Sequence, residues 1–133
     1  MRIMIDTNVL LSALIFNSTK LAKLLEHIIG TRSLVLCSYV IEESKIVIGR
    51  KSPNYLEAFD IFLSKISFEY FPTPIDLTGL PCIRDQQDLP IIASAIAAKV
   101  DVLITGDKDF AELIIPNLEI LTPSEFIDKY MSL

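Results

Sequence analysis

The chain has 133 residues, 51% of them hydrophobic, with a formal net charge of −5 and a pI of about 4.8. Its length favours one domain, residues 1–133, with a substantial core, and its acidity argues against a broad basic face for nucleic acid. Basic residues at Arg50–Lys51, Arg84 and Lys108 still offer local phosphate contacts. The longest uncharged apolar run, Thr7–Thr19, is too short and too polar to span a bilayer, so we expect no membrane segment.

The cysteine content and the N-terminus favour a cytoplasmic protein. The two cysteines, Cys37 and Cys82, are too few for a disulfide scaffold, so we interpret them as reduced thiols. Asp6 interrupts the first apolar stretch, and for this reason we expect no signal peptide. The single histidine, His27, argues against a catalytic triad or a zinc site.

Strand and helix patterns alternate along the whole chain. The apolar runs predict strands over residues 2–6, 34–37, 67–70, 102–105 and 119–121. The intervening patterns predict helices over residues 8–15, 19–29, 39–50, 54–66, 88–99 and 108–114, and a terminal helix from residue 123. This alternation implies a central parallel sheet with helices on both faces.

Several local signals mark where these elements begin and end. Gly30 suits the end of the second helix, and Ser52–Pro53 is a helix-start signal. Residues 71–83 contain three prolines, which predicts a loop. Thr122 and Glu125 have the spacing of a capping box at the start of the terminal helix.

The most informative feature of the sequence is the position of its acidic residues. Asp6 and Asp107 each follow an apolar run, and Asp88 opens another. Elements of an α/β fold begin or end at these positions, which is where such folds build their sites. Carboxylates that are brought together repel one another unless a cation lies between them, so the pattern predicts a divalent-metal site.

Taken singly, each of these acids is also explained by a helix N-cap. After the first strand, Asn8 can cap the helix equally well, which leaves the Asp6 carboxylate facing the crevice. Asp85 is more consistent with a loop or supporting position than Asp88, which the helix start at Pro90 places in or before the first turn. Thr105 offers a hydroxyl that can orient a metal-bound water.

Helical geometry separates two adjacent acids, Glu42 and Glu43. Projected at about 100° per residue, the helix has a broad apolar arc that includes Ile46. Glu43 lies inside this arc, where an unpaired carboxylate is costly and needs a cation or a proton. Glu42 lies outside it with Lys45, as an ordinary surface pair.

In these residues the chain resembles the PIN-domain nucleases, in particular the small toxins of prokaryotic toxin–antitoxin systems. The resemblance covers nearly the whole chain and rests on four motifs in order: Asp6–Leu10, Glu43, Asp88 with Ile91, Ala93 and Ala95, and Thr105–Phe110. It implies a three-layer, Rossmann-like α/β/α sandwich with a central, mainly parallel sheet of four to five strands.

The resemblance also implies the roles of the site residues. The residues expected to be catalytic and to hold the metal directly or through water are Asp6, Glu43, Asp88 and Asp107, with Asp109 as a further candidate ligand. The choice within the pairs Glu42/Glu43, Asp85/Asp88 and Asp107/Asp109 stays open. Oxygen-only ligands select Mg²⁺ or Mn²⁺ over zinc. Supporting roles are expected for Asn8, Thr105 and Asp85, and contacts to substrate phosphate for Arg84 and Lys108.

The implied function is metal-dependent endoribonuclease activity, with hydrolysis of RNA phosphodiester bonds. The resemblance further implies a cognate antitoxin and homodimerisation, for which the first two helices offer apolar surface through Leu10, Leu11, Leu14, Leu21, Leu24 and Leu25. Core packing is expected to account for many of these leucines. One alternative is a catalytically silent binding module with the same fold. Another is an aspartate-based phosphotransfer or receiver domain, which the sequence favours less. A hydrolase with an aspartate nucleophile needs a second Asp two residues after the first, where this chain has Asn8. A receiver domain needs paired acids after its first strand, which Met4–Ile5–Asp6 lacks.

Overall fold

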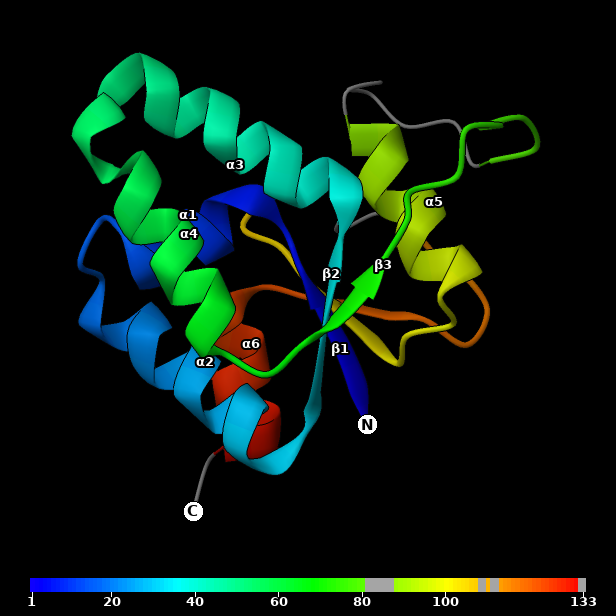
Figure 1. The fold of residues 1–133 in the computed structure, drawn as a ribbon. Coiled ribbons are helices and arrows are strands. Elements are labelled where there is room, and N and C mark those ends of the chain that lie inside the picture. The colour runs from blue at the N-terminus through cyan, green and yellow to red at the C-terminus, as the bar shows by residue number, and fades with distance from the viewer. Residues whose placement is uncertain (81–87, 108–109, 111–112, 132–133) are drawn as a thin grey trace.

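A single five-stranded sheet, parallel throughout, organises the molecule (Figure 1). The computed structural model describes residues 1–80, 88–107, 110 and 113–131. The strands are β1 (Arg2–Ile5), β2 (Ser33–Cys37), β3 (Glu69–Phe71), β4 (Val102–Ile104) and β5 (Glu119–Leu121), and they lie in the order β3-β2-β1-β4-β5. The predicted fold class, a parallel α/β sandwich, is confirmed. Four to five strands were expected, and the sheet has five.

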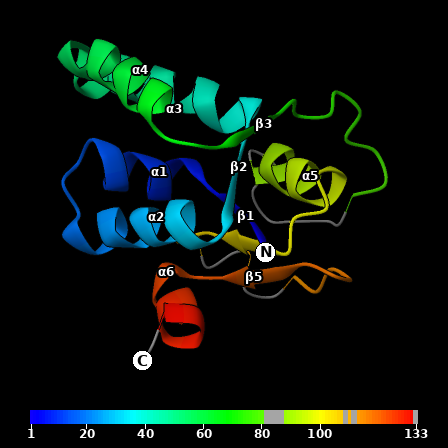
Figure 2. The ribbon, with the colours of Figure 1, turned by 60° about the horizontal axis from the view of Figure 1, so that its bottom comes forward.

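Helices cover both faces of this sheet. One face carries α1 (Thr7–Leu14), α2 (Thr19–Thr31), α3 (Ser38–Lys51), α4 (Leu56–Lys65) and α6 (Pro123–Phe126), and the other carries α5 (Leu89–Ala97) (Figures 1 and 2). A 3-10 turn, Pro53–Tyr55, precedes α4, and a π-helical segment, Ile127–Met131, follows α6. Among the residues that the structure describes, no helix has the length and apolarity needed to cross a membrane.

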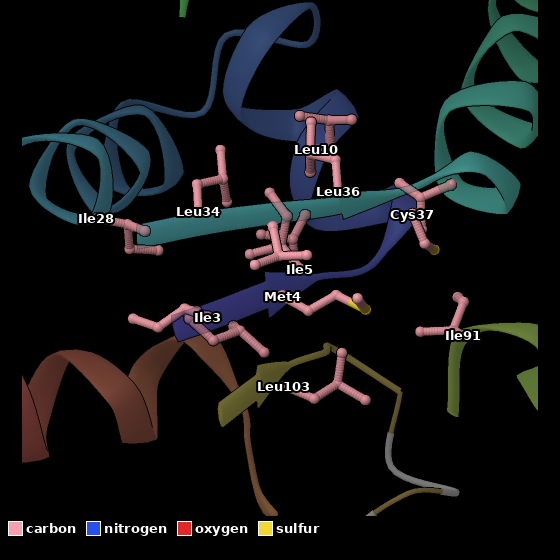
Figure 3. Packing of buried hydrophobic residues seen from close by; sticks show 14 of the residues in the cluster. Ile3, Met4, Ile5, Leu10, Ile28, Leu34, Leu36, Cys37, Ile91 and Leu103 are labelled. Atoms are coloured by element: carbon pink, nitrogen blue, oxygen red, sulfur yellow. The ribbon is translucent and has the colours of Figure 1, made fainter. Parts of the chain in front are cut away.

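The core explains why the strand sequences are almost wholly apolar. Ile3, Met4 and Ile5 have no exposed surface, because β1 lies in the middle of the sheet with helices on both sides. Figure 3 shows Leu10 of α1 and Ile91 of α5 approaching this strand from different sides. Parallel strands covered on both faces are expected to read as continuous apolar runs, as these do.

The leucines of the first two helices belong mainly to this core. Leu10, Leu11, Leu24 and Leu25 are buried, while Leu14 and Leu21 are partly buried against the cluster. The expectation that core packing accounts for many of these leucines is therefore confirmed, and little of their surface is left for a partner. Each of these helices packs its apolar side on the sheet, which uses most of its leucines.

Several predicted boundaries differ from the structure. Gly30 does not end α2, which continues through Thr31 and closes with a hydrogen bond from the Arg32 N–H to the Ile28 carbonyl. Ser52 makes no side-chain capping hydrogen bond, and the 3-10 turn that follows it delays α4 to Leu56. Glycine and serine carry no apolar anchor of their own, so packing of the neighbouring residues decides their conformation.

The segment after β4 also departs from the prediction. Of the helix expected over residues 108–114, residues 108, 109, 111 and 112 lie outside the described residues, Phe110 has 3-10 helical conformation, and Leu113 and Ile114 are not helical. Ile115 instead forms an isolated bridge with Leu118. The capping box at the start of α6 is confirmed, with Thr122 and Glu125 each bonded to the other's backbone N–H.

The strand order creates a switch point between β1 and β4. The connections from β1 run through β2 to β3 on one side, whereas β4 and β5 lie on the other side of β1. In doubly wound sheets the crevice at the carboxyl ends of two such strands is where sites form. The backbone pairing continues past the strands, with a hydrogen bond of 3.1 Å from the Asp6 N–H to the Ile104 carbonyl.

Thr73, in the loop after β3, ties three elements together at the same edge of the sheet. Its Oγ1 accepts a hydrogen bond of 3.1 Å from the Tyr39 N–H and lies 2.9 Å from the Ser94 hydroxyl. Its own N–H donates to Ser38 Oγ at 2.9 Å. These bonds connect the start of α3 and the middle of α5 to the loop. They therefore fix the positions of α3, which carries Glu43, and of α5, which Asp88 precedes, relative to each other.

We predict that Thr73→Val destabilises the fold by about 1–3 kcal/mol, because the Tyr39 N–H loses its acceptor. Urea unfolding followed by circular dichroism measures the change. The matched control is Thr78→Val in the same loop, where the exposed side chain should cost no more than about 0.5 kcal/mol. Equal destabilisation by the two substitutions would show that Thr73 does not tie the helices together.

Candidate active site

Asp6 is the most buried acidic side chain described and stands directly after β1. It is 6% exposed. Its Oδ1 accepts a hydrogen bond of 2.9 Å from the Val9 N–H, which makes Asp6 itself the N-cap of α1. The expectation that Asn8 caps this helix is therefore wrong. The exposed Asn8 side chain lies in the first turn, two residues past the position at which a cap forms.

The second carboxylate oxygen of Asp6 joins it to the end of β4. Asp6 Oδ2 accepts a hydrogen bond of 2.6 Å from the Thr105 hydroxyl, and Thr105 is 2% exposed. The Thr105 oxygen in turn accepts a hydrogen bond of 3.1 Å from the Asp107 N–H. One buried threonine thus connects the two acids that follow the central strands.

This bond is consistent with the supporting role expected for Thr105, because its hydroxyl donates to Asp6, a candidate metal ligand, and so orients it. That Thr105 also orients a metal-bound water stays a prediction. The sequence signal for this role was the placement of a threonine two residues before an aspartate at a strand end. A pairing between residues 99 positions apart becomes visible only when the register of β1 and β4 is known.

Burial raises the pKa of the Asp6 carboxyl above its ordinary value. The negative charge of Asp107 acts in the same direction, while hydrogen bonds from Thr105 and from the Val9 and Gly106 backbones oppose it. The folded chain therefore disfavours the ionised form of Asp6. A cation beside Asp6 and Asp107 would reverse this preference by neutralising the charge.

Glu43 lies one turn into α3, which starts immediately after β2. It is half-buried, whereas Glu42 is exposed, as the helical projection predicted. Its Oε2 accepts a hydrogen bond of 2.9 Å from the Tyr39 hydroxyl, a contact that sequence reasoning missed although the spacing of four residues allows it.

The rest of this helix face is less apolar than the projection suggested. Ile46 is 55% exposed, so the apolar arc is narrower than predicted. Lys45 makes an ion pair of 3.7 Å with Asp60 of α4, a partner that the sequence pattern of α3 alone did not indicate. The projection treats the helix in isolation and takes no account of which neighbours cover it.

Asp88 occupies the N-cap position of α5 and is half-buried. Within the described residues, its side chain makes no capping hydrogen bond to this helix. Because α5 leads into the parallel strand β4, its N-terminus faces the carboxyl edge of the sheet. Capping therefore does not account for Asp88, and the residue stands at the same edge as the other acids.

The structure brings the predicted acids to one edge and links Asp6 to Asp107 through Thr105. The Thr105 hydroxyl bonds the Asp6 carboxylate and the Asp107 N–H, while Glu43 and Asp88 approach the edge on α3 and α5. In the parts of the chain that the structure describes, no three Asp, Glu, His or Cys side chains form a group that could hold a metal. The remaining candidates Arg84, Asp85, Lys108 and Asp109 lie outside the described residues.

Two adjacent carboxylates suit a particular kind of metal site. Mg²⁺ commonly binds proteins through one or two carboxylates and takes its other ligands from water and substrate phosphates. The oxygen-only donors Asp6 and Asp107, one of them buried and costly to ionise, match this description. The residues present therefore fit a hard divalent cation.

Comparison with known proteins agrees with this fold. The chain is similar to VapBC2 from Rickettsia felis, solved bound to a DNA fragment from its promoter, with 25% identity, a TM-score of 0.69, and coverage of 90% of this chain and 97% of that one. It is also similar in fold to DNA-bound VapBC from Salmonella typhimurium, with 18% identity, a TM-score of 0.66, and coverage of 92% and 98%. None of the curated proteins matches the chain significantly.

A match to a protein-family model identifies the family of this chain. The model described as the PIN domain matches residues 2–109, which include β1 through β4 and the positions of Asp6, Glu43, Asp88 and Asp107. This span is most of the chain and contains the whole switch point. The chain belongs to the PIN domain family.

Proposed function

We propose that this chain is a metal-dependent endoribonuclease that hydrolyses RNA phosphodiester bonds and acts as the toxin of a toxin–antitoxin pair. The observation that carries the proposal is the pairing of Asp6 and Asp107 through Thr105 at the switch point of the sheet. Membership of the PIN domain family and the likeness to VapBC structures support a nuclease.

In this proposal Asp6 and Asp107 hold Mg²⁺ or Mn²⁺, and Glu43 and Asp88 act on it through water. When bound, the cation supplies charge for a substrate phosphate, lowers the pKa of water and stabilises the leaving oxygen. The chain holds its own ligands in place beforehand, since Val9, Gly106 and Thr105 all donate hydrogen bonds to Asp6. Such preorganisation removes reorganisation from the catalytic step.

The Glu43 carboxylate is likewise held in place by a hydrogen bond from another side chain. The Tyr39 hydroxyl fixes the direction of its carboxylate, which would otherwise sample several rotamers on the face of α3. A carboxylate fixed one turn from the edge of the sheet is suited to orient a water molecule at the metal. Tyr39 is thus proposed as a positioning residue.

We further propose that the chain pairs with a cognate antitoxin protein and forms a homodimer. The likeness to VapBC structures supports a protein partner. Large apolar side chains on the outer side of α3 and α4 remain exposed, with Ile46 at 55%, Ile61 at 44% and Phe62 at 39%. Exposed apolar side chains gathered on neighbouring helices are typical of surfaces that bind other proteins.

We predict that Asp6→Asn abolishes RNA cleavage while leaving the fold intact. Asn retains the oxygen that caps α1, and its Nδ2 can donate to the Thr105 oxygen, which keeps that connection with the direction of the hydrogen bond reversed. Removal of a buried charge does not destabilise the metal-free protein at neutral pH, because the raised pKa of Asp6 means that its ionised form is the costly one. Cleavage of total RNA in Mg²⁺ or Mn²⁺ measures the first effect, and thermal unfolding in EDTA measures the second.

The same variant tests the metal. In the wild-type protein, cation at about a hundred times its dissociation constant should add about 2.7 kcal/mol to stability, and Asp6→Asn should lose most of this gain. Unchanged ribonuclease activity in an Asp6→Asn preparation free of contaminating nucleases would refute the proposed function.

We predict that Glu43→Gln lowers kcat for RNA cleavage by about 10–100-fold, whereas Glu42→Gln leaves it unchanged. The two residues are adjacent, carry the same charge and undergo the same chemical change, so net charge is matched. Tyr39→Phe should give a smaller loss, since it keeps the carboxylate and removes only its hydrogen bond. Equal losses for the Glu42 and Glu43 variants would contradict the assignment of Glu43.

A further inference from the structure

A cavity of about 400 Å³ opens directly beside the paired acids. Its lining comes from three separate elements and the turn after β4: Asn8, Val9, Ser12, Leu21, Gly106, Asp107 and Pro123. Asp107 lines this cavity, and its negative charge also acts on Asp6. The space is continuous with the proposed site of cleavage.

The walls of this cavity are held in place by bonds already described. Asn8, Val9 and Ser12 belong to the capped helix α1, and Pro123 follows the capping residue Thr122. A hydrogen bond of 2.5 Å from Lys20 Nζ to Ser124 Oγ links α2 to α6, one residue along the chain from the lining residues Leu21 and Pro123. Pockets that are formed before the ligand arrives bind without an ordering cost.

The chemistry of the lining suits a flat, polar-edged group. Val9, Leu21 and Pro123 present apolar surfaces, against which a ring can pack. Asn8 and Ser12 are four residues apart on α1, so their side chains lie on the same helix face. An amide and a hydroxyl together offer donors and acceptors for the edge of a nucleobase or for a ribose hydroxyl.

Other cavities have similar volumes but do not include either of the paired acids in their lining. One of about 400 Å³ lies by the amino ends of the strands, between Lys99, Asp101 and Leu118. Another, of about 380 Å³, lies on the far side of α2 and includes Asn17 and Ala22. Volume therefore does not distinguish the cavity beside Asp107; its continuity with the acids does.

We propose that the cavity between α1, α2 and the start of α6 holds the nucleoside next to the cleaved phosphodiester, and that Asn8 and Ser12 select its base. The proposal rests on the proposed function, because it places the scissile phosphate at Asp6 and Asp107. Lys20, which is exposed and precedes Leu21 in α2, supplies a positive charge for the neighbouring phosphate of the same strand. Asn8 and Ser12 are then specificity-determining residues, and Leu21 provides apolar surface on which the base packs.

Cleavage of a randomised RNA oligonucleotide pool, with the cut ends sequenced, tests this assignment. Wild-type protein should show a base preference at one nucleotide adjacent to the cut. Ser12→Leu fills the cavity, and we expect it to remove that preference and to raise KM by about 5- to 150-fold, the loss expected when one base can no longer pack on the protein. Ser12→Ala keeps the volume and should alter the preference with little change in KM.

The matched control is Ala22→Leu, which fills the cavity on the far side of α2. It should leave both KM and base preference at the wild-type values. If Ser12→Leu and Ser12→Ala, both folded by circular dichroism, also keep the wild-type preference and KM, the cavity is not a nucleoside subsite, and the proposed nuclease function stands without it.

A binding measurement separates this proposal from the proposed function. Titration of metal-free, isotope-labelled protein with AMP, GMP, CMP and UMP should shift the amide resonances of Val9, Ser12 and Leu21, and Ser12→Leu should abolish the shifts. If wild-type protein cleaves no RNA, the proposed function fails, and this titration alone decides the cavity. Absence of any shift at these residues would overturn the proposal.

Discussion

The hydrogen bond between the Thr105 hydroxyl and Asp6 is the interaction on which the arrangement of the site depends. It joins residues that follow β1 and β4, the two strands whose connections diverge at the centre of the sheet. Through its second bond, to the Asp107 N–H, Thr105 also sets the turn that carries the other acid. The parallel register of the two strands places the three residues side by side. The site therefore follows from strand order and from one buried hydroxyl, and the surrounding helices add Glu43 and Asp88 at its edge.

This arrangement has an energetic consequence. A carboxylate buried at the end of a strand, with another beside it, is less stable in its ionised form than the same group in water. The hydrogen bonds from Val9, Gly106 and Thr105 offset part of that cost and hold the oxygens in fixed directions. A hard cation removes the rest by neutralising the charge, which links metal binding to the stability of the fold. The same groups thus serve structure when they cap α1 and function when they hold the ion.

Much of the fold could be predicted from the sequence because its central strands are continuous apolar runs separated by amphipathic helices. The carboxyl ends of those runs located Asp6 and Asp107, and helical geometry distinguished Glu43 from Glu42. What sequence reasoning missed were contacts that require register and packing: the bond of Thr105 to Asp6 and the bond of Tyr39 to Glu43. The sequence offered both Asp6 and Asn8 as caps for α1, and packing selects Asp6. The sequence leaves open how many leucines of α1 and α2 face a partner, because an amphipathic pattern does not say whether a sheet or a partner covers the apolar side of a helix. The cavity beside Asp107 is formed by elements far apart along the chain, and no local pattern indicates it.

The most direct test of the central claim is anomalous diffraction from crystals of the wild-type protein grown with Mn²⁺. If Asp6 and Asp107 hold the cation, an anomalous peak lies between them, within coordination distance of an oxygen of each carboxylate. We expect this peak to be lost in crystals of the Asp6→Asn variant. A well-ordered structure at saturating Mn²⁺ with no peak there, or with the ion bound only elsewhere, would contradict it.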